Sequence, residues 1–312
     1  QLWKFGLLGR DFYYRPLGSL WVTTDEPQPG ETPAFGRGAR VYNVIDARQA
    51  YLQKVVQAGL RALGFEREAE NSIHFSYEMV ALSPRCCAEL GIELSEEDRR
   101  RPYVEVSGRK GLGVKADDLV DALIEKALEE VRSRHPEASS EYQRGIATRI
   151  AVGALRYFLL KFTRTSVIAF DFQEALSFEG ETGPYVQYAA VRAQNILRKL
   201  VERGETLPDF AAALEAGAFA RQLAQEDFWQ VLLGASQADA VIENALTNGE
   251  PSAVARYAFQ LAQGFNNFYH QHHILSETDR EKKTFLLWMT QFFASQLSGV
   301  LGVLGIETPE VM

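Results

Sequence analysis

The spacing of apolar residues changes character part-way along the chain. Before about residue 117, short apolar runs rich in β-branched and aromatic residues alternate with turns, and one run is followed by a helical pattern. After residue 117, apolar residues recur at helical spacing almost without interruption. The pattern predicts an α/β part followed by an all-α part, with the boundary between residues 134 and 145.

The two parts are expected to contain the following elements. Strands are predicted at 19–24, 40–46, 72–82 and 103–106, and a helix at 49–63. Further helices are predicted at 118–134, 143–161, 183–203, 210–223, 228–233, 237–248, 252–269 and 277–304. A chain of 312 residues with 46% hydrophobic content can form two cores, so two domains are expected.

The helix predicted to start at Gly183 carries the most informative side chains. Pro184 lacks an amide hydrogen and has the φ angle of a first helical turn, so it suits this position. Tyr185, Tyr188 and Arg192 then share one face at about 100° per residue. Two rings and a guanidinium on one stripe suit base stacking and phosphate contact. The alternative is an ordinary helix packed on a core, with the arginine in a surface ion pair.

Charge and cysteine content narrow the class of protein. The net charge of −8 argues against a nucleic-acid partner unless basic residues form local patches. Two candidate patches exist, and a solvated face is the alternative for each: Arg99, Arg100, Arg101, Arg109, Lys110 and Lys115; and Arg192, Arg198, Lys199 and Arg203. The adjacent Cys86 and Cys87 are expected to be free thiols in a reducing compartment. No apolar run approaches the roughly 20 residues of a membrane span, so a soluble, cytoplasmic protein without a membrane partner is expected.

A glycine-rich basic turn lies at 106–113, between a predicted strand and a predicted helix. Its glycines let the backbone approach a phosphate closely, and Ser107, Arg109 and Lys110 can donate hydrogen bonds to it. This composition favours nucleotide binding, although ordinary surface loops share it.

Other polar residues are weaker candidates. Asp46 and Gln49 lie at the end of a predicted strand, where ligands bind in open α/β sheets. His74 stands alone on a strand, which is more typical of a hydrogen-bonded structural residue. The histidines at 270–273 lack a nearby carboxylate or thiolate pattern, so no metal site is expected.

Three segments in combination resemble the class I arginyl-tRNA synthetases: 176–192, 260–269 and 304–312. The resemblance runs from about Arg40 to Met312. It implies a partial class I Rossmann-like catalytic domain at 1–140 joined to a helical-bundle anticodon-binding domain at 141–312. It also implies a ligase that joins arginine to tRNA-Arg with ATP, Mg²⁺ being the counter-ion of ATP, and releases AMP and pyrophosphate.

The resemblance also assigns roles to residues. Ser107, Arg109 and Lys110, with Gly108, resemble the family's degenerate Lys-Met-Ser-Lys-Ser loop and are expected to hold the ATP phosphates as arginyl-adenylate forms. Asp46, Gln49 and His74 are expected to line the adenosine pocket. The residues expected to contact tRNA are Tyr185, Gln187, Tyr188, Arg192, Asn266, Tyr269 and Met312.

One departure from the family pattern matters. None of the five histidines stands in an H-x-G-H arrangement, so the His-Ile-Gly-His half of the catalytic site is missing from these 312 residues. We therefore expect the C-terminal portion of a synthetase. Separately, we expect a monomer in solution. Two alternatives remain open: a non-catalytic tRNA-binding paralogue, and a helical protein-interaction scaffold without nucleic acid.

Overall fold

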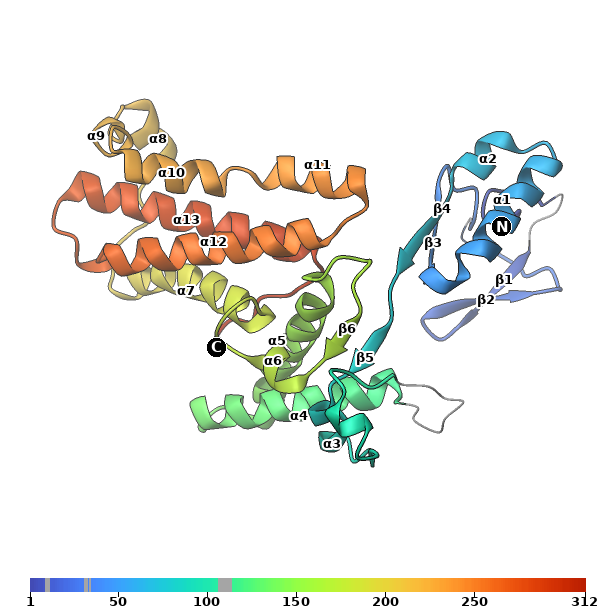
Figure 1. Ribbon diagram of the computed structural model, residues 1–312. Helices are drawn as coiled ribbons and strands as arrows, with labels where there is room; N and C mark the ends of the chain where they lie inside the picture. Colours follow the sequence, from blue (N-terminus) through green and yellow to red (C-terminus); the bar gives the residue numbers. More distant parts are fainter. Residues whose placement is uncertain (9–11, 31–32, 34, 106–113) are drawn as a thin grey trace. The chain divides into compact units, whose positions relative to one another are not determined.

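A computed structural model of the chain describes residues 1–8, 12–30, 33, 35–105 and 114–312 (Figure 1). Tertiary contacts divide the chain into two compact units, Gln1–Met79 and Val80–Met312. Each unit has a hydrophobic core of its own.

In its described residues, the first unit contains two two-stranded sheets and two helices. Its elements are β1 (Tyr13–Leu17), β2 (Leu20–Thr24), β3 (Val41–Asp46), the 3-10 turn η1 (Ala47–Gln49), α1 (Ala50–Ala62), α2 (Glu66–Glu70) and β4 (Ser72–Tyr77). Strands β1 and β2 form an antiparallel hairpin whose turn begins at Gly18, with a positive φ of 61° that glycine adopts without strain. Strands β3 and β4 pair in parallel, and the core consists of Phe5, Val41, Leu60 and Ala69. The predicted strand–helix unit after residue 40 is confirmed.

The second unit begins with a short parallel sheet and the helices around it. These elements are β5 (Val80–Leu82), α3 (Pro84–Glu89), the 3-10 turn η2 (Asp98–Arg100), α4 (Ala116–Arg134), α5 (Ser140–Leu160), β6 (Ile168–Phe170) and α6 (Phe172–Leu176). Strand β5 pairs with β6 although the two are far apart in sequence. Helices α4 and α5 pack closely, and Leu123, Ile150 and Phe158 belong to the core between these elements.

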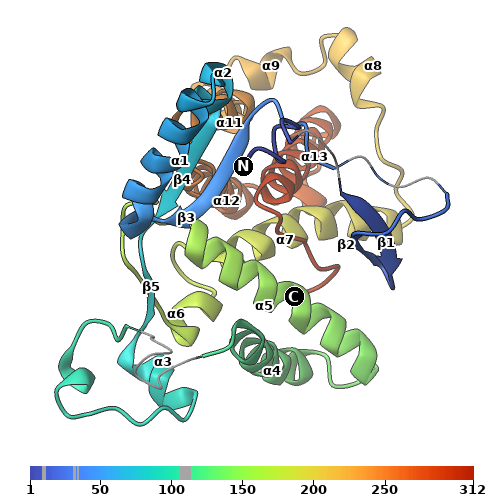
Figure 2. The same ribbon diagram turned by 90° about the vertical axis from the view of Figure 1, so that its right-hand side faces the viewer.

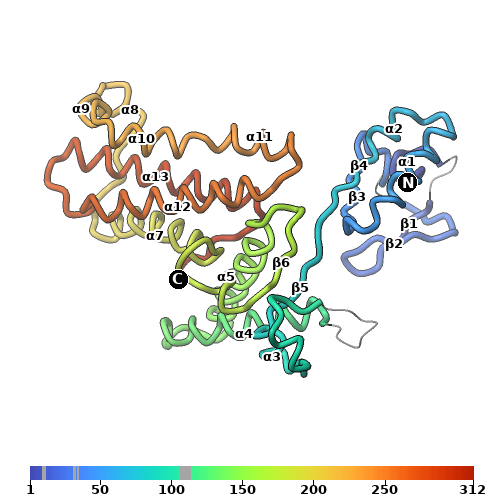
Figure 3. The backbone as a smooth tube through the Cα atoms, in the orientation of Figure 1, coloured from blue at the N-terminus to red at the C-terminus, as the bar shows by residue number. Residues whose placement is uncertain are grey.

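Seven further helices build the rest of this unit. They are α7 (Gly183–Glu202), α8 (Phe210–Glu215), α9 (Ala220–Leu223), α10 (Glu226–Ala235), α11 (Ala238–Asn248), α12 (Ser252–Gln271) and α13 (Arg280–Val303), with the 3-10 turn η4 (Ile274–Ser276) after α12. Helices α7, α12 and α13 run side by side (Figure 3). Their shared core is aromatic, with Phe265, Phe285 and Phe293 almost completely buried.

Helix α7 begins as the sequence predicts. Thr182 caps it, since its hydroxyl accepts a hydrogen bond of 3.3 Å from the backbone N–H of Tyr185. Gly183 lets this end of α7 touch α5. A Cβ built on Gly183 would lie 2.5 Å from the carbonyl oxygen of Gly153 and 2.8 Å from Cα of Ala154. The two helices can therefore cross this closely only where α7 has no side chain.

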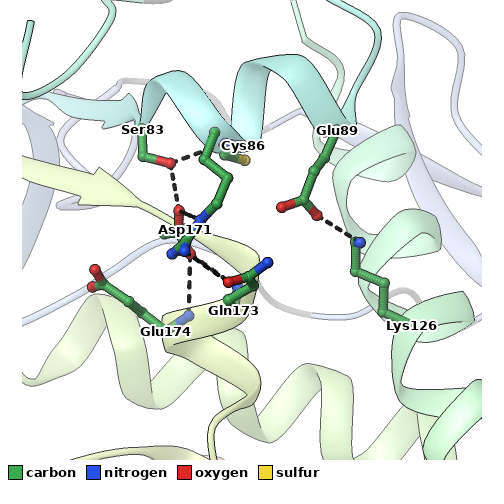
Figure 4. Close-up of polar contacts among 8 residues, drawn as sticks. Ser83, Cys86, Glu89, Lys126, Asp171, Gln173 and Glu174 are labelled. Carbon is green, nitrogen blue, oxygen red and sulfur yellow. Dashed lines mark hydrogen bonds and ion pairs between the residues drawn. The ribbon is translucent and has the colours of Figure 1, made fainter. Parts of the chain in front are cut away.

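A buried carboxylate joins β5 and α3 to β6 and α6 (Figure 4). Asp171 accepts hydrogen bonds from Ser83 Oγ at 2.6 Å and from Arg85 Nε at 2.9 Å, and it also pairs with Arg85 Nη2. It further accepts the backbone N–H groups of Gln173 at 3.0 Å and Glu174 at 3.1 Å, which caps α6. Burial alone raises the pKa of Asp171, but the hydrogen bonds from Arg85 and Ser83 outweigh it, so the pKa lies below its ordinary value.

The two cysteines lie in α3 beside this carboxylate. Both are free and buried, which confirms the expectation of free thiols. Burial, with smaller effects from Cys87 and Asp171, raises the pKa of Cys86 to about 12. The Cys86 thiol is therefore protonated at neutral pH and packs as a small apolar group.

Several predicted elements differ from those observed. The strand predicted at 72–82 is two strands, β4 and β5, which belong to different sheets and different compact units. The helix predicted at 210–223 is also wrong as a single element, because Gly217 with a positive φ of 71° separates α8 from α9. Of the strand predicted at 103–106, Val104 forms an isolated bridge with Leu82.

The compact units divide at Met79, not near residue 140. The reason is that α4, before the predicted boundary, packs on α5, after it. The assignment of 1–140 to a catalytic domain and of 141–312 to an anticodon-binding domain stays a prediction.

Helix α13 is long and apolar enough, by length and composition alone, to cross a membrane. Polar residues such as Thr284, Thr290 and Gln291 interrupt its apolar sequence, which is why no continuous apolar run marks it. Half of its most apolar stretch is buried, with Phe285 and Phe293 in the core against α7 and α12. This burial is what a core helix of a helical bundle shows.

Candidate functional site

A groove of about 550 Å³ runs along helix α7, and we call it the α7 groove. On α7 its lining residues are Tyr188, Val191, Arg192, Asn195, Ile196 and Lys199, and Arg203 directly follows the helix. Across from them it is lined by Tyr269, His270, His272, His273, Ile274, Leu275, Ser276 and Met312. The positions from 188 to 203 extend over roughly 22 Å at 1.5 Å per residue. The groove is therefore long enough for more than one small planar group.

A guanidinium between two aromatic rings forms part of the groove wall. The Arg192 guanidinium carbon lies 4.6 Å from the ring centre of Tyr188 and 5.0 Å from that of Tyr269. Its Nη1 donates a hydrogen bond of 2.7 Å to Oδ1 of the buried Asn266. Cation–π contact and this hydrogen bond together fix the guanidinium plane. The result is a rigid platform of one cation and two rings.

The groove is basic although the whole chain is acidic. None of the described residues that line it is acidic, while Arg192, Lys199 and Arg203 all contribute positive charge. An elongated groove with positive charge and aromatic side chains is the arrangement that binds single-stranded nucleic acid, because the backbone meets the charge and the bases stack on the rings.

One of the groove histidines, His272, carries little positive charge at neutral pH. Its ring lies 5.1 Å from that of Phe228 and 5.1 Å from that of Phe268. Burial lowers the pKa of His272, and nearby Lys282 lowers it further. Among the described residues, no group of three or more histidine, cysteine or acidic side chains is placed to hold a metal ion.

Comparisons with known proteins match the part of the chain that contains the α7 groove. The model of the DALR anticodon binding domain matches residues 186–312, which include every residue that lines the α7 groove. The arginine–tRNA ligases of Pyrococcus furiosus and Thermococcus kodakarensis are 33% and 35% identical to the chain over its full length, and the chain covers 46% of each. The solved Thermus thermophilus arginyl-tRNA synthetase has a TM-score of 0.76 and 27% identity, covering 100% of this chain and 47% of that one. The chain matches the C-terminal portion of arginyl-tRNA synthetases.

The match concerns the C-terminal portion of these synthetases, and the chain spans about half the length of the curated relatives it matches. A more distant structure, the arginyl-tRNA synthetase of Plasmodium falciparum, shares the fold with a TM-score of 0.63 at 17% identity. The recognition of a synthetase C-terminal portion, and of a partial α/β part followed by helices, is confirmed.

Most of the residues that the synthetase resemblance assigns to tRNA converge at the groove. Tyr188, Arg192, Tyr269 and Met312 line it, and Asn266 supports Arg192 from behind. These residues come from α7, α12 and the segment after α13. The structure thus brings together side chains that lie up to 124 positions apart in the sequence.

Besides Asn266, two of the assigned residues do not line the groove. The ring of Tyr185 packs against that of Phe259 on α12, with centres 5.3 Å apart. Gln187 is completely buried and its side chain binds backbone carbonyl groups. Their predicted contacts with tRNA are untested, but in this arrangement both serve the packing around α7.

The residues expected in the adenosine pocket lie in the first unit. Asp46 is the last residue of β3, caps η1 and binds Arg48 through both carboxylate oxygens, and these hydrogen bonds lower the pKa of Asp46. Gln49 is exposed at the end of η1. His74 Nε2 donates to the carbonyl oxygen of Ile45 at 2.9 Å, the hydrogen-bonded role typical of a lone histidine. Their roles toward adenosine stay predictions.

The loop expected to bind the ATP phosphates falls outside the described residues. Ser107, Gly108, Arg109 and Lys110 all belong to the range 106–113. Their assignment rests on the motif and on the family alone.

Sequence reasoning found only part of the groove face. Lys199 and Arg203 were named as part of a basic patch, but Asn195 was missed. All three continue the stripe of Tyr188 and Arg192 at spacings of three and four residues, a signal that could have extended the predicted face. The turn at Ile274–Ser276 carries no comparable sequence signal. It lines the groove because it directly follows the end of α12.

Proposed function

We propose that this chain contributes the anticodon-reading part of an arginine–tRNA ligase, together with a portion of its catalytic fold. The observation that carries this proposal is the Arg192 platform between Tyr188 and Tyr269, in a groove whose described lining contains no acidic residue. Bases of an anticodon loop can leave their stack, lie on aromatic or guanidinium planes and be read by hydrogen bonds. Each such stacking contact contributes roughly 1–3 kcal/mol.

The proposed reaction has two steps. A carboxylate oxygen of arginine attacks the α-phosphorus of ATP, so arginyl-adenylate forms and pyrophosphate leaves. A ribose hydroxyl of the tRNA then attacks the activated carbonyl carbon, and AMP leaves as the ester forms. In this proposal Ser107, Arg109 and Lys110 donate to the phosphates, where negative charge develops in the transition state. Mg²⁺ enters with ATP as its counter-ion.

A binding experiment tests the reading role. In filter binding, the chain is expected to retain a tRNA-Arg transcript at least about tenfold more tightly than a tRNA for another amino acid, as specific readout requires. Equal retention of both, or of neither, would overturn the proposal. The scaffold alternative predicts retention of neither.

An activity experiment tests the catalytic role. The full product of the gene that encodes this chain is expected to exchange pyrophosphate into ATP when arginine and tRNA-Arg are both present. Binding of tRNA-Arg without any exchange would instead identify the non-catalytic paralogue. A monomeric state, a cytoplasmic location and the absence of a membrane partner also stay predictions.

A further inference from the structure

The amide of Gln187 connects three parts of the second unit. Gln187 lies on α7 directly before Tyr188, yet its side chain is completely buried. Its Nε2 donates to the carbonyl oxygen of Arg149 on α5 at 3.0 Å and to that of Glu307 at 2.8 Å. Both amide hydrogens are thereby used, one on each of two backbone segments.

The surroundings of Gln187 are shaped for this amide. A Cβ on Gly153 of α5 would lie 2.4 Å from Nε2 and 2.8 Å from Oε1 of Gln187, so only glycine leaves room there. Oε1 is buried without a hydrogen-bond partner among the described residues. An unpaired buried oxygen costs stability, and an apolar side chain of similar size avoids that cost. If this side chain only filled space, it would not need to be glutamine. The role of Gln187 is therefore to donate its two hydrogen bonds.

The second carbonyl belongs to the segment of residues 305–312, which we call the tail segment. Figures 1 and 2 show it leaving α13 and running past α7 to a position beside α5. Helix α5 holds it from the exposed side as well: Arg156 Nη1 donates to the carbonyl oxygen of Gly305 at 2.8 Å, and Arg149 pairs with the Glu307 carboxylate at 3.2 Å. Gln187 holds it from the buried side.

Beyond this attachment the tail segment turns inward. Pro309 is buried, and Val311 and Met312 pack against the core around α4, α5 and α6. Met312 also lines the α7 groove with Tyr188 and Tyr269. The hydrogen bond at Glu307 therefore lies five residues before a side chain that forms part of the groove wall.

We propose that Gln187 is a positioning residue that fixes the tail segment, so that Met312 closes one part of the α7 groove and sets the size of base it accepts. The inference rests on the proposed function for its RNA consequence. The attachment itself is a property of the chain that can be measured without RNA.

The first measurement uses the methionine methyl groups. The chain has three methionines, so ¹³C-methyl labelling gives three resonances, and Met312→Leu assigns one of them. In Gln187→Leu, the Met312 resonance is expected to move to the position of an exposed methionine, while that of Met289, completely buried in the bundle core, stays in place. An unmoved Met312 resonance would overturn the proposal.

A matched control and a second variant keep this measurement decisive. Gln194 lies on the same helix but is exposed, with Nε2 donating to Ser298 Oγ at 3.2 Å, so Gln194→Leu should leave Met312 unmoved. If Gln187→Leu also displaces Met289, the fold has changed, and Arg156→Leu is used instead. Arg156 is exposed, and losing its bond to Gly305 should displace Met312 alone; an unmoved Met312 would again overturn the proposal.

The second measurement is RNA binding in a double-mutant cycle. Gln187→Leu and Met312→Ala are each expected to weaken binding of a tRNA-Arg anticodon stem-loop about tenfold, and the double variant about tenfold as well, because both remove the same wall. A product of the two effects, about a hundredfold, would show that Gln187 acts independently of Met312. If the wild-type chain binds no tRNA at all, the proposed function fails, and the methyl resonances alone decide the attachment.

Discussion

Arg192 on α7 and Asn266 on α12 are joined by a hydrogen bond of 2.7 Å across 74 positions of sequence. The same offset of 74 separates Tyr185 from Phe259, whose rings also touch, so α7 and α12 run in the same direction and in register. Asn266 is buried, whereas Arg192 reaches the groove. The bond therefore anchors a groove residue to the core.

Replacing Arg192 tests whether this anchored plane matters for RNA. Arg192→Lys keeps the charge but removes the flat guanidinium that contacts both rings while bonding Asn266. We expect an anticodon stem-loop to bind about tenfold more weakly, or roughly 1–2 kcal/mol. The control is Arg198→Lys on the same helix, where the arginine is exposed and its pair with Glu202 is 3.5 Å long. Equal affinities for the two variants in filter binding would contradict the platform's role.

The α5–α7 crossing gives a prediction on stability. Gly183→Ala places a Cβ against the backbone of α5, and we expect a loss of about 1–3 kcal/mol in the free energy of unfolding measured with urea. Gly145→Ala is the control on α5, since a Cβ there meets nothing within 4 Å. Because alanine favours a helix interior, this control should gain up to about 1 kcal/mol. An unchanged free energy of unfolding in Gly183→Ala would mean that α5 and α7 can move apart without loss of stability.

Substitution of Asp171 should lower the free energy of unfolding more than substitution of most other polar residues. Asp171→Ala leaves Ser83 and the first turn of α6 without their acceptor, and we expect a loss of about 3 kcal/mol in urea unfolding. Asp209→Ala is the matched control, because Asp209 caps α8 from an exposed position, and it should cost about 1 kcal/mol.

The effect of Asp171→Ala also has a predicted pH dependence. The folded-state pKa of Asp171 is lowered, so its contribution is fully present above the unfolded pKa of about 3.9 and is lost as pH falls through the folded value. The difference between wild type and variant should thus be constant from pH 5 to 7 and shrink below about pH 4. A difference that already shrinks at pH 6 would assign the effect to another group.

His272 gives a second pH dependence of stability, closer to neutral pH. Its folded-state pKa is lowered, so the unfolded chain binds the proton more readily, and stability falls as pH drops from about 6.5 until the folded pKa is passed. The slope is at most about 1.4 kcal/mol per pH unit for one proton. His272→Gln should therefore lose less stability than wild type between pH 7 and pH 5. An unchanged slope in His272→Gln would assign the pH dependence to another group.

Sequence patterns predicted some of these features and not others for identifiable reasons. The start of α7 was predictable because Pro184 is a local signal, and the groove face followed from helical spacing. The burial of Gln187 was not predicted, because a polar residue is expected at the surface, whereas its amide is buried on two carbonyl groups. Tyr185 lies on the predicted face, but α12 covers the first turns of α7, and only the tertiary arrangement shows this.

Short elements were the other difficulty. Strand β6 has three residues and α6 five, too few for a periodic pattern to emerge. Both depend on partners distant in sequence, namely β5 and the residues that bind Asp171. Their structure is specified by these contacts more than by local sequence.

The concentration of basic side chains in the α7 groove has a consequence for how a polyanion meets this chain. Because the net charge is −8 and Arg192, Lys199 and Arg203 lie together, the remaining surface is more acidic than the chain as a whole. Phosphate groups are therefore drawn to the α7 groove by local charge, although the chain as a whole repels them. A duplex too stiff to present an unstacked base in the groove gains little from this attraction, so the charge distribution disfavours double-stranded nucleic acid as a ligand of the groove.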